Sequence, residues 1–186
     1  MTTRNLKLDP ARTLILVVDV QERLCSAMPP ADLERLVKYA RALMGAAREL
    51  GLPVLATEQY PKGLGPTVAA LRELFPSPPV EKMHFSCVPE PAFAAALEAT
   101  HCRQIVIAGM ETHVCVFQTA RDLAAIGYDV YVCADAVTSR FEEHRRTGLE
   151  LCREAGAVVT TAETAIFDLL GQCGTTQFKR VAPLVK

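Results

Sequence analysis

Short apolar segments that do not alternate with polar residues recur along this chain. A β-strand with both faces buried has this pattern, whereas a strand with one solvated face alternates. Strands buried on both faces occur almost only in parallel sheets that helices cover on each side. Five such segments lie at residues 13–18, 53–57, 104–109, 129–133 and 157–161, with a weaker sixth at residues 80–84.

The stretches between these apolar segments carry patterns typical of amphipathic helices. In the longest, residues 32–50, apolar side chains recur on one face at the helical period. Asp32 is placed to cap its first turn, and Gly51 and Pro53 are placed to end it. Five further helices are predicted at residues 67–74, 90–100, 114–126, 142–155 and 163–170.

Repeated strand–helix–strand units indicate a parallel sheet with right-handed crossovers. The predicted fold class is therefore α/β: a three-layer α/β/α, Rossmann-like arrangement with helices on both faces of the sheet. At 186 residues the chain has the length of one domain, so we expect a single domain over residues 1–186.

Composition and charge exclude several classes of function. The 20 basic and 21 acidic side chains leave a net charge of −1, so neither nucleic acid nor anionic lipid is an expected partner. The apolar runs are far shorter than the ~18 residues of a membrane span. The seven cysteines form no CxxC pair, which favours reduced thiols in a cytoplasmic protein over a disulfide framework or a zinc site.

Ligands of such sheets bind beyond the carboxyl ends of the strands, and three reactive residues lie at these positions. Cys115 falls near the start of a predicted helix, where unpaired N–H groups favour a thiolate. A neighbouring Lys82 would lower the pKa of that thiol further. Asp19 could accept the thiol proton and return it to a leaving amine. The N–H of Cys115 and another amide of residues 109–112 could form an oxyanion hole.

Each of these residues also has an ordinary structural interpretation. Asp19 could simply form a turn, Lys82 could be solvated, and Cys115 could be a small buried apolar residue. Their occurrence at three strand ends favours the catalytic interpretation. Position alone suggests six residues that line a substrate pocket: Gln21, Gln59, Tyr60, Phe85, His113 and Phe117.

Two of these six residues have an explicit alternative. His113 could be a helix-start residue that the backbone satisfies. Tyr60 lies in a loop rich in proline and glycine, where an aromatic ring is either a lid over a ligand or a contact between subunits.

Three motifs in order along the chain resemble the isochorismatase-like cysteine hydrolase superfamily. They are Val18-Asp19-Val20-Gln21, Lys82 after the third strand, and Gly109-Met110-Glu111-Thr112-His113-Val114-Cys115-Val116. The resemblance extends from about Thr13 to the C-terminus. Residues 57–65 and 134–140 are similar to a narrower group, the isochorismatase-domain-containing hydrolases of undefined substrate.

The resemblance implies a six-stranded, mostly parallel sheet in the order 3-2-1-4-5-6 and a catalytic set of Asp19, Lys82 and Cys115. It also implies a cis peptide bond between Met110 and Glu111, which turns the Glu111 amide toward the oxyanion. The oxyanion hole would then comprise the amides of Glu111 and Cys115. The resemblance further implies a homo-oligomer that hydrolyses a small molecule through a Cys thioester.

Two departures from relatives within the superfamily narrow the chemistry. Nicotinamidases bind a metal through an Asp-x-His motif and a further histidine, but the corresponding loop, residues 58–62, contains no histidine. We therefore expect no metal and no cofactor. True isochorismatases lack the nucleophilic cysteine, so Cys115 disfavours their reaction.

The sequence thus predicts a metal-independent cysteine hydrolase that cleaves a C–N or related bond of a small molecule. One alternative is a catalytically silent binding or regulatory module on the same fold. Another is a thiol redox protein that acts through Cys115. The presence of all three reactive residues favours the hydrolase.

Overall fold

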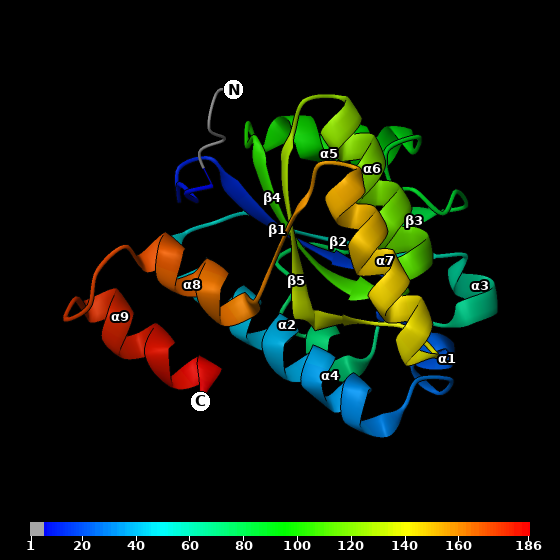
Figure 1. Ribbon diagram of the computed structural model, residues 1–186, viewed down its shortest axis with the longest axis horizontal. Helices are drawn as coiled ribbons and strands as arrows, with labels where there is room; N and C mark the ends of the chain where they lie inside the picture. Colours follow the sequence, from blue (N-terminus) through cyan, green and yellow to red (C-terminus); the bar gives the residue numbers. More distant parts are fainter. Residues whose placement is uncertain (1–5) are drawn as a thin grey trace.

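The computed structural model describes residues 6–186. Their strands form a six-stranded sheet in the order β3-β2-β1-β4-β5-β6 (Figure 1). Every neighbouring pair of strands is parallel. The predicted α/β fold class and strand order are therefore confirmed. The strands are β1 (Thr13–Val18), β2 (Val54–Gln59), β3 (Val80–Lys82), β4 (Gln104–Met110), β5 (Asp129–Thr138) and β6 (Val158–Thr160).

Strand β5 continues five residues beyond the segment predicted from its apolar run. Ile107 of β4 pairs with Val132, but Gly109 pairs with Val137, so the register shifts between these positions. The extra residues of β5 bulge out of the ladder and then return to pair beside β4. This irregularity brings the end of β5 next to the end of β4, where the apolar pattern alone gave no strand.

Helices and helical turns connect the strands. They are α1 (Glu22–Cys25), α2 (Pro30–Leu50), α3 (Pro61–Leu64), α4 (Ala69–Arg72), the π-helix η1 (Thr112–Val116), α5 (Pro91–Ala99), α6 (Phe117–Ala125), α7 (Glu142–Glu154), α8 (Ala162–Leu170), α9 (Thr176–Val181) and the 3₁₀ helix η2 (Ala182–Val185). The helix predicted over residues 67–74 is only the single turn α4. The helix predicted over residues 114–126 is divided between η1 and α6.

The start of α2 differs from the sequence prediction. Pro29 occupies the cap position and Pro30 the first helical position, where a missing N–H costs nothing. Asp32 lies inside the first turn and forms an ion pair with Arg35 at 2.7 Å. The prediction that Asp32 caps this helix is therefore wrong, because the two prolines before it already fix the helical start.

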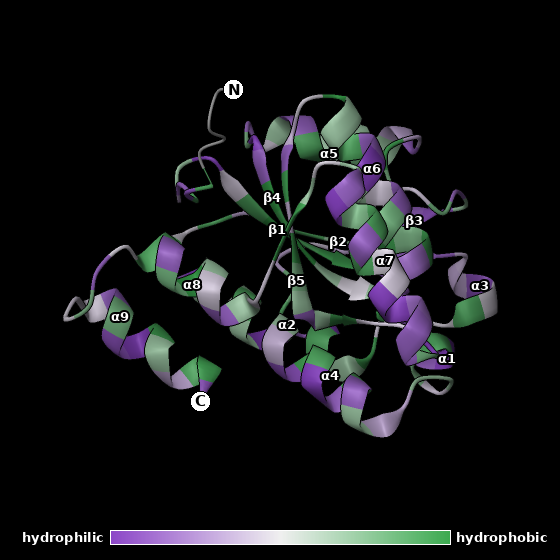
Figure 2. Ribbon diagram, in the orientation of Figure 1, coloured by the Kyte–Doolittle hydropathy of each residue, from purple (hydrophilic) through white to green (hydrophobic). Residues whose placement is uncertain are grey.

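The helices form two layers that cover opposite faces of the sheet (Figure 1). Helices α2, α8 and α9 pack on one face, and α5, α6 and α7 pack on the other. Successive residues of β1 point to alternate layers: Ile15 and Val17 to the first, Leu14 and Leu16 to the second. Figure 2 shows strands that are hydrophobic along most of their length, as strands buried on both faces must be.

None of the helices within residues 6–186 has the length and apolar character that a membrane crossing requires.

Candidate active site

Asp19, Lys82 and Cys115 meet at the carboxyl edge of the sheet. Asp19 directly follows β1, Lys82 is the last residue of β3, and Cys115 lies in η1 after β4. The Lys82 Nζ lies 2.8 Å from Asp19 Oδ2, and the charges of Asp19 and Lys82 both act on the pKa of the Cys115 thiol. The exposed fractions of the three residues are 0%, 2% and 6%. The structure therefore brings together the three residues that the sequence singled out.

The backbone at Asp19 is held in an uncommon conformation. Its φ of 50° lies in the left-handed region, which costs free energy for any residue other than glycine. Its N–H donates to the Thr57 carbonyl at 3.1 Å, so β2 fixes this turn. On the other side, a Cβ atom at Gly109 would lie 2.1 Å from the Val18 carbonyl oxygen. Only glycine fits where β4 passes the end of β1.

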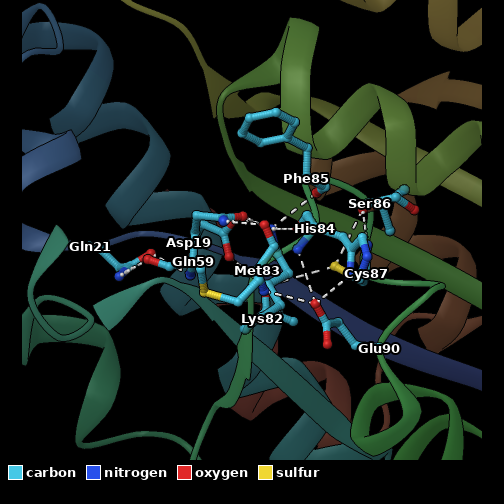
Figure 3. Close-up of polar contacts among 12 residues, drawn as sticks. Asp19, Gln21, Gln59, Lys82, Met83, His84, Phe85, Ser86, Cys87 and Glu90 are labelled. Atoms are coloured by element: carbon cyan, nitrogen blue, oxygen red, sulfur yellow. Dashed lines mark hydrogen bonds and ion pairs between the residues drawn. The ribbon is translucent and has the colours of Figure 1, made fainter. Parts of the chain in front are cut away.

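Lys82 is buried among four oxygen acceptors (Figure 3). Besides Asp19, its ammonium contacts Gln59 Oε1 at 2.7 Å and the carbonyls of His84 and Phe85 at 3.1 and 3.0 Å. Burial lowers the pKa of Lys82, but its interactions with Asp19 first, and then with Cys115 and Cys87, outweigh burial, so the pKa is raised. Lys82 is therefore a permanent cation at the centre of the site.

Glu90 braces the segment that supplies these two carbonyls. One of its carboxylate oxygens accepts the backbone N–H groups of Met83 and His84 at 2.8 and 3.0 Å and lies 2.8 Å from His84 Nδ1. These hydrogen bonds lower the pKa of Glu90 to about 2. The loop after β3 is thus tied down by a carboxylate that stays ionised under mildly acidic conditions.

The ionisation of Cys115 is opposite to the sequence-based expectation. Burial and then the negative charge of Asp19 raise the pKa of Cys115 to about 12, although Lys82 lowers it. The expectation of a lowered pKa is wrong because it included Lys82 and the helix start but neither burial nor the charge of Asp19. At rest Cys115 is therefore a neutral thiol.

The predicted oxyanion residues lie in one short segment between β4 and α6. The Met110–Glu111 peptide bond is cis. The Glu111 carboxylate accepts hydrogen bonds from the backbone N–H and Nε of Arg140, at 3.2 and 3.0 Å. Glu111 and Cys115 both belong to this segment, and the pointing of their amides toward an oxyanion stays a prediction.

Gln21 and Gln59 link the loops around the site. The Gln21 amide nitrogen donates to the carbonyls of Gln59 and Gly65, and its oxygen accepts the Gln59 N–H at 2.8 Å. The Gln59 amide nitrogen donates to the Met83 carbonyl, while its oxygen faces Lys82. Both side chains are buried, and these contacts give them a bracing role beside the predicted catalytic residues.

Tyr60 and Phe85 are half exposed at the rim of the site. Tyr60, with a φ of 37°, lines a cavity of about 230 Å³ together with Lys82, Met83 and Glu90. A larger cavity, about 680 Å³, lies between α2 and the C-terminal η2 and is lined by none of the predicted site residues.

His113 and Phe117 make specific side-chain contacts. His113 Nδ1 lies 3.0 Å from the Ser139 hydroxyl, so a side chain rather than the backbone satisfies it. Its ring centre lies 4.7 Å from that of His144, with the two rings tilted by 40°, and burial lowers the pKa of His113. Phe117 packs against the core of the second layer, with the Arg121 guanidinium 5.5 Å from its ring centre.

Three polar residues at the site were not predicted: Thr57, Cys87 and Thr119. Thr57 donates a hydrogen bond to Asp19 at 2.7 Å. It ends the second apolar segment, so reading each strand end for polar residues could have identified it. Cys87 lies in the segment between β3 and α5, and Thr119 lies in α6. Nothing in the sequence connects either residue to Asp19.

Within residues 6–186, no three histidine, cysteine or acidic side chains are grouped in a way that could hold a metal ion.

The family model of the isochorismatase domain matches residues 13–164. Isochorismatase domain-containing protein 1 of Salmo salar is 38% identical over 182 residues, which are 95% of this chain and 62% of that protein. This chain therefore spans less than two thirds of that relative. The secreted isochorismatase effector Isc1 of Phytophthora sojae is 36% identical over 190 residues, covering 100% of this chain and 90% of the effector.

Two solved structures have the same fold. The MAR1 ribonuclease of Caenorhabditis elegans superposes with a TM-score of 0.89 at 35% identity, covering 96% of this chain and 92% of that one. YcaC of Pseudomonas aeruginosa, solved with hexane-2,5-diol and covalent acrylamide, also has a TM-score of 0.89, at 26% identity and with coverage of 98% and 93%.

Proposed function

This chain belongs to the isochorismatase domain family, and on that premise we propose that it is a metal-independent cysteine hydrolase of a small amide or imide-like substrate. The family supplies a hydrolase fold. The observation that carries the proposal is the buried ion pair of Asp19 and Lys82, 2.8 Å apart, whose two charges act on the buried Cys115 thiol. A thiol beside a carboxylate and a fixed cation is a nucleophile paired with its own base.

In the proposed first step, the Asp19 carboxylate takes the Cys115 proton as the sulfur attacks the substrate carbonyl carbon. The C–S bond forms, and the carbonyl electron pair moves to the oxygen, which the amides of Glu111 and Cys115 stabilise. The oxyanion then collapses and the C–N bond breaks. The proton held by Asp19 goes to the departing amine, which leaves a thioester on Cys115.

Water completes the cycle. Asp19 accepts a proton from the water molecule that attacks the thioester carbon. As the second oxyanion collapses, the C–S bond breaks and the proton returns from Asp19 to the sulfur. Lys82 transfers no proton in this scheme, and its charge stabilises both Asp19 and the transient thiolate.

The raised pKa of Cys115 is consistent with this mechanism. A permanent thiolate in so buried a site would cost considerable desolvation energy. With a neutral thiol at rest, the charge forms only as Asp19 accepts the proton during the attack. The nucleophile is therefore generated by proton transfer within the site rather than by ionisation into solvent.

The relatives bear on the substrate class. Covalent acrylamide in the Pseudomonas aeruginosa structure supports a nucleophilic residue in that protein, and by likeness we assign the role here to Cys115. The Caenorhabditis elegans structure is that of a ribonuclease. The net charge of −1 and the burial of Cys115 favour a small substrate over RNA in this chain.

Turnover of a panel of small amides, imides and carbamoyl compounds tests the proposal, with an RNA substrate included in the panel. We expect release of an amine or ammonia and a mass increase at Cys115 when the acyl-enzyme is trapped by acid quench. Cys115→Ala abolishes both. Cys152→Ala is the matched control, because Cys152 is also buried with a pKa of about 12, but it lies in α7 and the charge that acts on it is that of Arg153 rather than of a carboxylate.

Undiminished amide hydrolysis by Cys115→Ala contradicts the proposal. Binding of a panel compound without any acyl adduct favours the silent binding module. A reversible mixed disulfide on Cys115 under mild peroxide, without hydrolysis, favours the redox protein.

A further inference from the structure

We propose that Thr57 is a positioning residue for Asp19, and that a directed chain of hydrogen bonds from Thr119 through Cys87 fixes its hydroxyl. The inference rests on the proposed function, since it concerns the base that activates Cys115. None of these three residues takes part in the proposed bond-making steps.

This chain of hydrogen bonds connects four segments of the fold that are distant in sequence. Thr119 of α6 donates to the Cys87 sulfur at 3.3 Å, and Cys87, in the segment between β3 and α5, donates to Thr57 Oγ1 at 3.9 Å. Thr57 of β2 donates to Asp19 Oδ1 at 2.7 Å. Each of the four residues is at most 1% exposed, so solvent offers no competing partners.

The direction of these hydrogen bonds is set at Thr119, the end farthest from Asp19. The backbone N–H of Cys87 donates to Thr119 Oγ1 at 3.0 Å, which holds that oxygen as an acceptor while its own proton points to the Cys87 sulfur. The Cys87 proton is then free to point to Thr57, and the Thr57 proton to Asp19. A chain of bonds oriented in one direction strengthens its last member by polarisation.

This arrangement fixes the plane of the Asp19 carboxylate. Lys82 lies 2.8 Å from Asp19 Oδ2 (Figure 3). Thr57 donates to the other carboxylate oxygen, Oδ1. A donor to the ionised form favours that form, so the Thr57 hydroxyl supports the carboxylate that accepts the thiol proton in the proposed mechanism. Burial, and next the charge of Asp19, raise the pKa of Cys87 to about 11, so Cys87 keeps the proton that it donates.

The pH dependence of Cys115 alkylation by iodoacetamide, followed by peptide mass mapping, tests this role. The proposed mechanism requires the Asp19 carboxylate to accept the Cys115 proton, so we expect an acidic limb on which the alkylation rate falls with falling pH. In Thr57→Val we expect this acidic limb to move up by about one pH unit, the shift expected when a charged group loses one hydrogen bond. Thr57→Ser, which keeps the hydroxyl, retains the wild-type profile.

Cys87 provides an independent variant if Thr57→Val does not fold. Cys87→Ala moves the acidic limb in the same direction by a smaller amount, and Cys87→Ser restores it. Thr13→Val is the matched control, because Thr13 is equally buried in β1 but its hydroxyl bonds Asp9 and Gln104 at the opposite edge of the sheet. We expect Thr13→Val to lower the melting temperature and to leave the pH dependence of Cys115 alkylation unchanged.

Two results overturn the inference, and they are distinguishable. If Asp19→Asn removes the acidic limb but Thr57→Val leaves it unchanged, the positioning role of Thr57 fails and the proposed function stands. If Asp19→Asn itself leaves the acidic limb unchanged, or Cys115 is not alkylated, the proposed function fails and this inference with it.

Discussion

At the scale of single residues, the chemistry depends on charges that shift one another's ionisation. Asp19 raises the pKa of Cys115 and Lys82 lowers it, while burial acts in the same direction as Asp19. Two opposite charges beside one thiol therefore have opposite effects on its reactivity. Both charges are nevertheless required for turnover in the proposed mechanism, since one moves the proton and the other stabilises the resulting charges.

This opposition gives a prediction for two single variants. Asp19→Asn lowers the pKa of Cys115, so the alkaline rise in its alkylation rate moves to lower pH, whereas Lys82→Met moves that rise to higher pH. Hydrolysis falls by about 10²-fold or more in both variants. Alkylation profiles that move in the same direction would show that the two charges do not act on Cys115 as the structure indicates.

At the scale of elements, short irregular segments rather than regular helices hold the site. Cys115 lies in the π-helix η1, and irregular helical turns of this type are frequent at functional sites. Lys82 depends on carbonyls of the loop after β3, which Glu90 ties down. Each segment is held by a neighbour whose substitution can be tested.

Gly148 of α7 sets how closely that helix approaches η1. A Cβ atom at this position would lie 2.7 Å from the backbone nitrogen of His113. We expect Gly148→Ala to push the two elements apart, to reduce the free energy of unfolding by roughly 1–3 kcal/mol and to slow Cys115 alkylation. Denaturant unfolding measures the first effect, with exposed Arg146→Ala as the control; equal stability of the two variants contradicts the packing argument.

The lowered pKa of Glu90 predicts how acid affects the stability of the loop after β3. The pKa of Glu90 in the folded state, about 2, lies below its value in the unfolded state, ~4.3. The ionised Glu90 therefore stabilises the fold at pH values above ~4.3, and this contribution is lost as the pH falls to about 2. In Glu90→Gln this part of the pH dependence is absent. Melting temperatures from pH 5 to pH 2 should converge for the two proteins at the acidic end, and a constant difference would exclude this role.

At the scale of the whole molecule, the sheet divides the core into two layers and gathers the site at one edge. Several large apolar side chains are exposed on the loops after β2, β3 and β5 at this same edge: Tyr60, Met83, Phe85 and Phe141. Apolar residues exposed together around a site are typical of a surface that another molecule covers. The homo-oligomer expected from the sequence stays a prediction, and so does a cytoplasmic location.

If a second copy of this chain covers that edge, Phe85→Asp lowers the molar mass measured by light scattering after size exclusion. The contact of Lys82 with residue 85 is through the backbone carbonyl and persists in the variant. Ile126→Asp is the control, because Ile126 is exposed to a similar degree, 56% against 55%, at the opposite edge of the sheet. A wild-type protein that is monomeric over the accessible concentration range would exclude this interface.

The sequence by itself determined the α/β fold class, the parallel pairing of the strands and the three residues of the proposed mechanism, whereas the strand order came from the family resemblance. Continuous apolar runs report burial on both faces, which is a local property of a strand, and the strand ends of a parallel sheet must share one edge. Residues such as Asp19 and Cys115 could therefore be paired without coordinates. The extension of β5 and the start of α2 were missed because they depend on a shifted register and on the geometry of two prolines.

Only the tertiary structure decided how the site is ionised and oriented. The pKa of Cys115 depends on burial and on the charge of Asp19, and neither can be read from positions 96 residues apart in the chain. The hydrogen bonds that lead from Thr119 to Asp19 cannot be read from the sequence either, because their four residues come from four separate segments. Hydrogen bonds and charge interactions fall off within a few ångströms, so they depend on distances that periodicity does not encode.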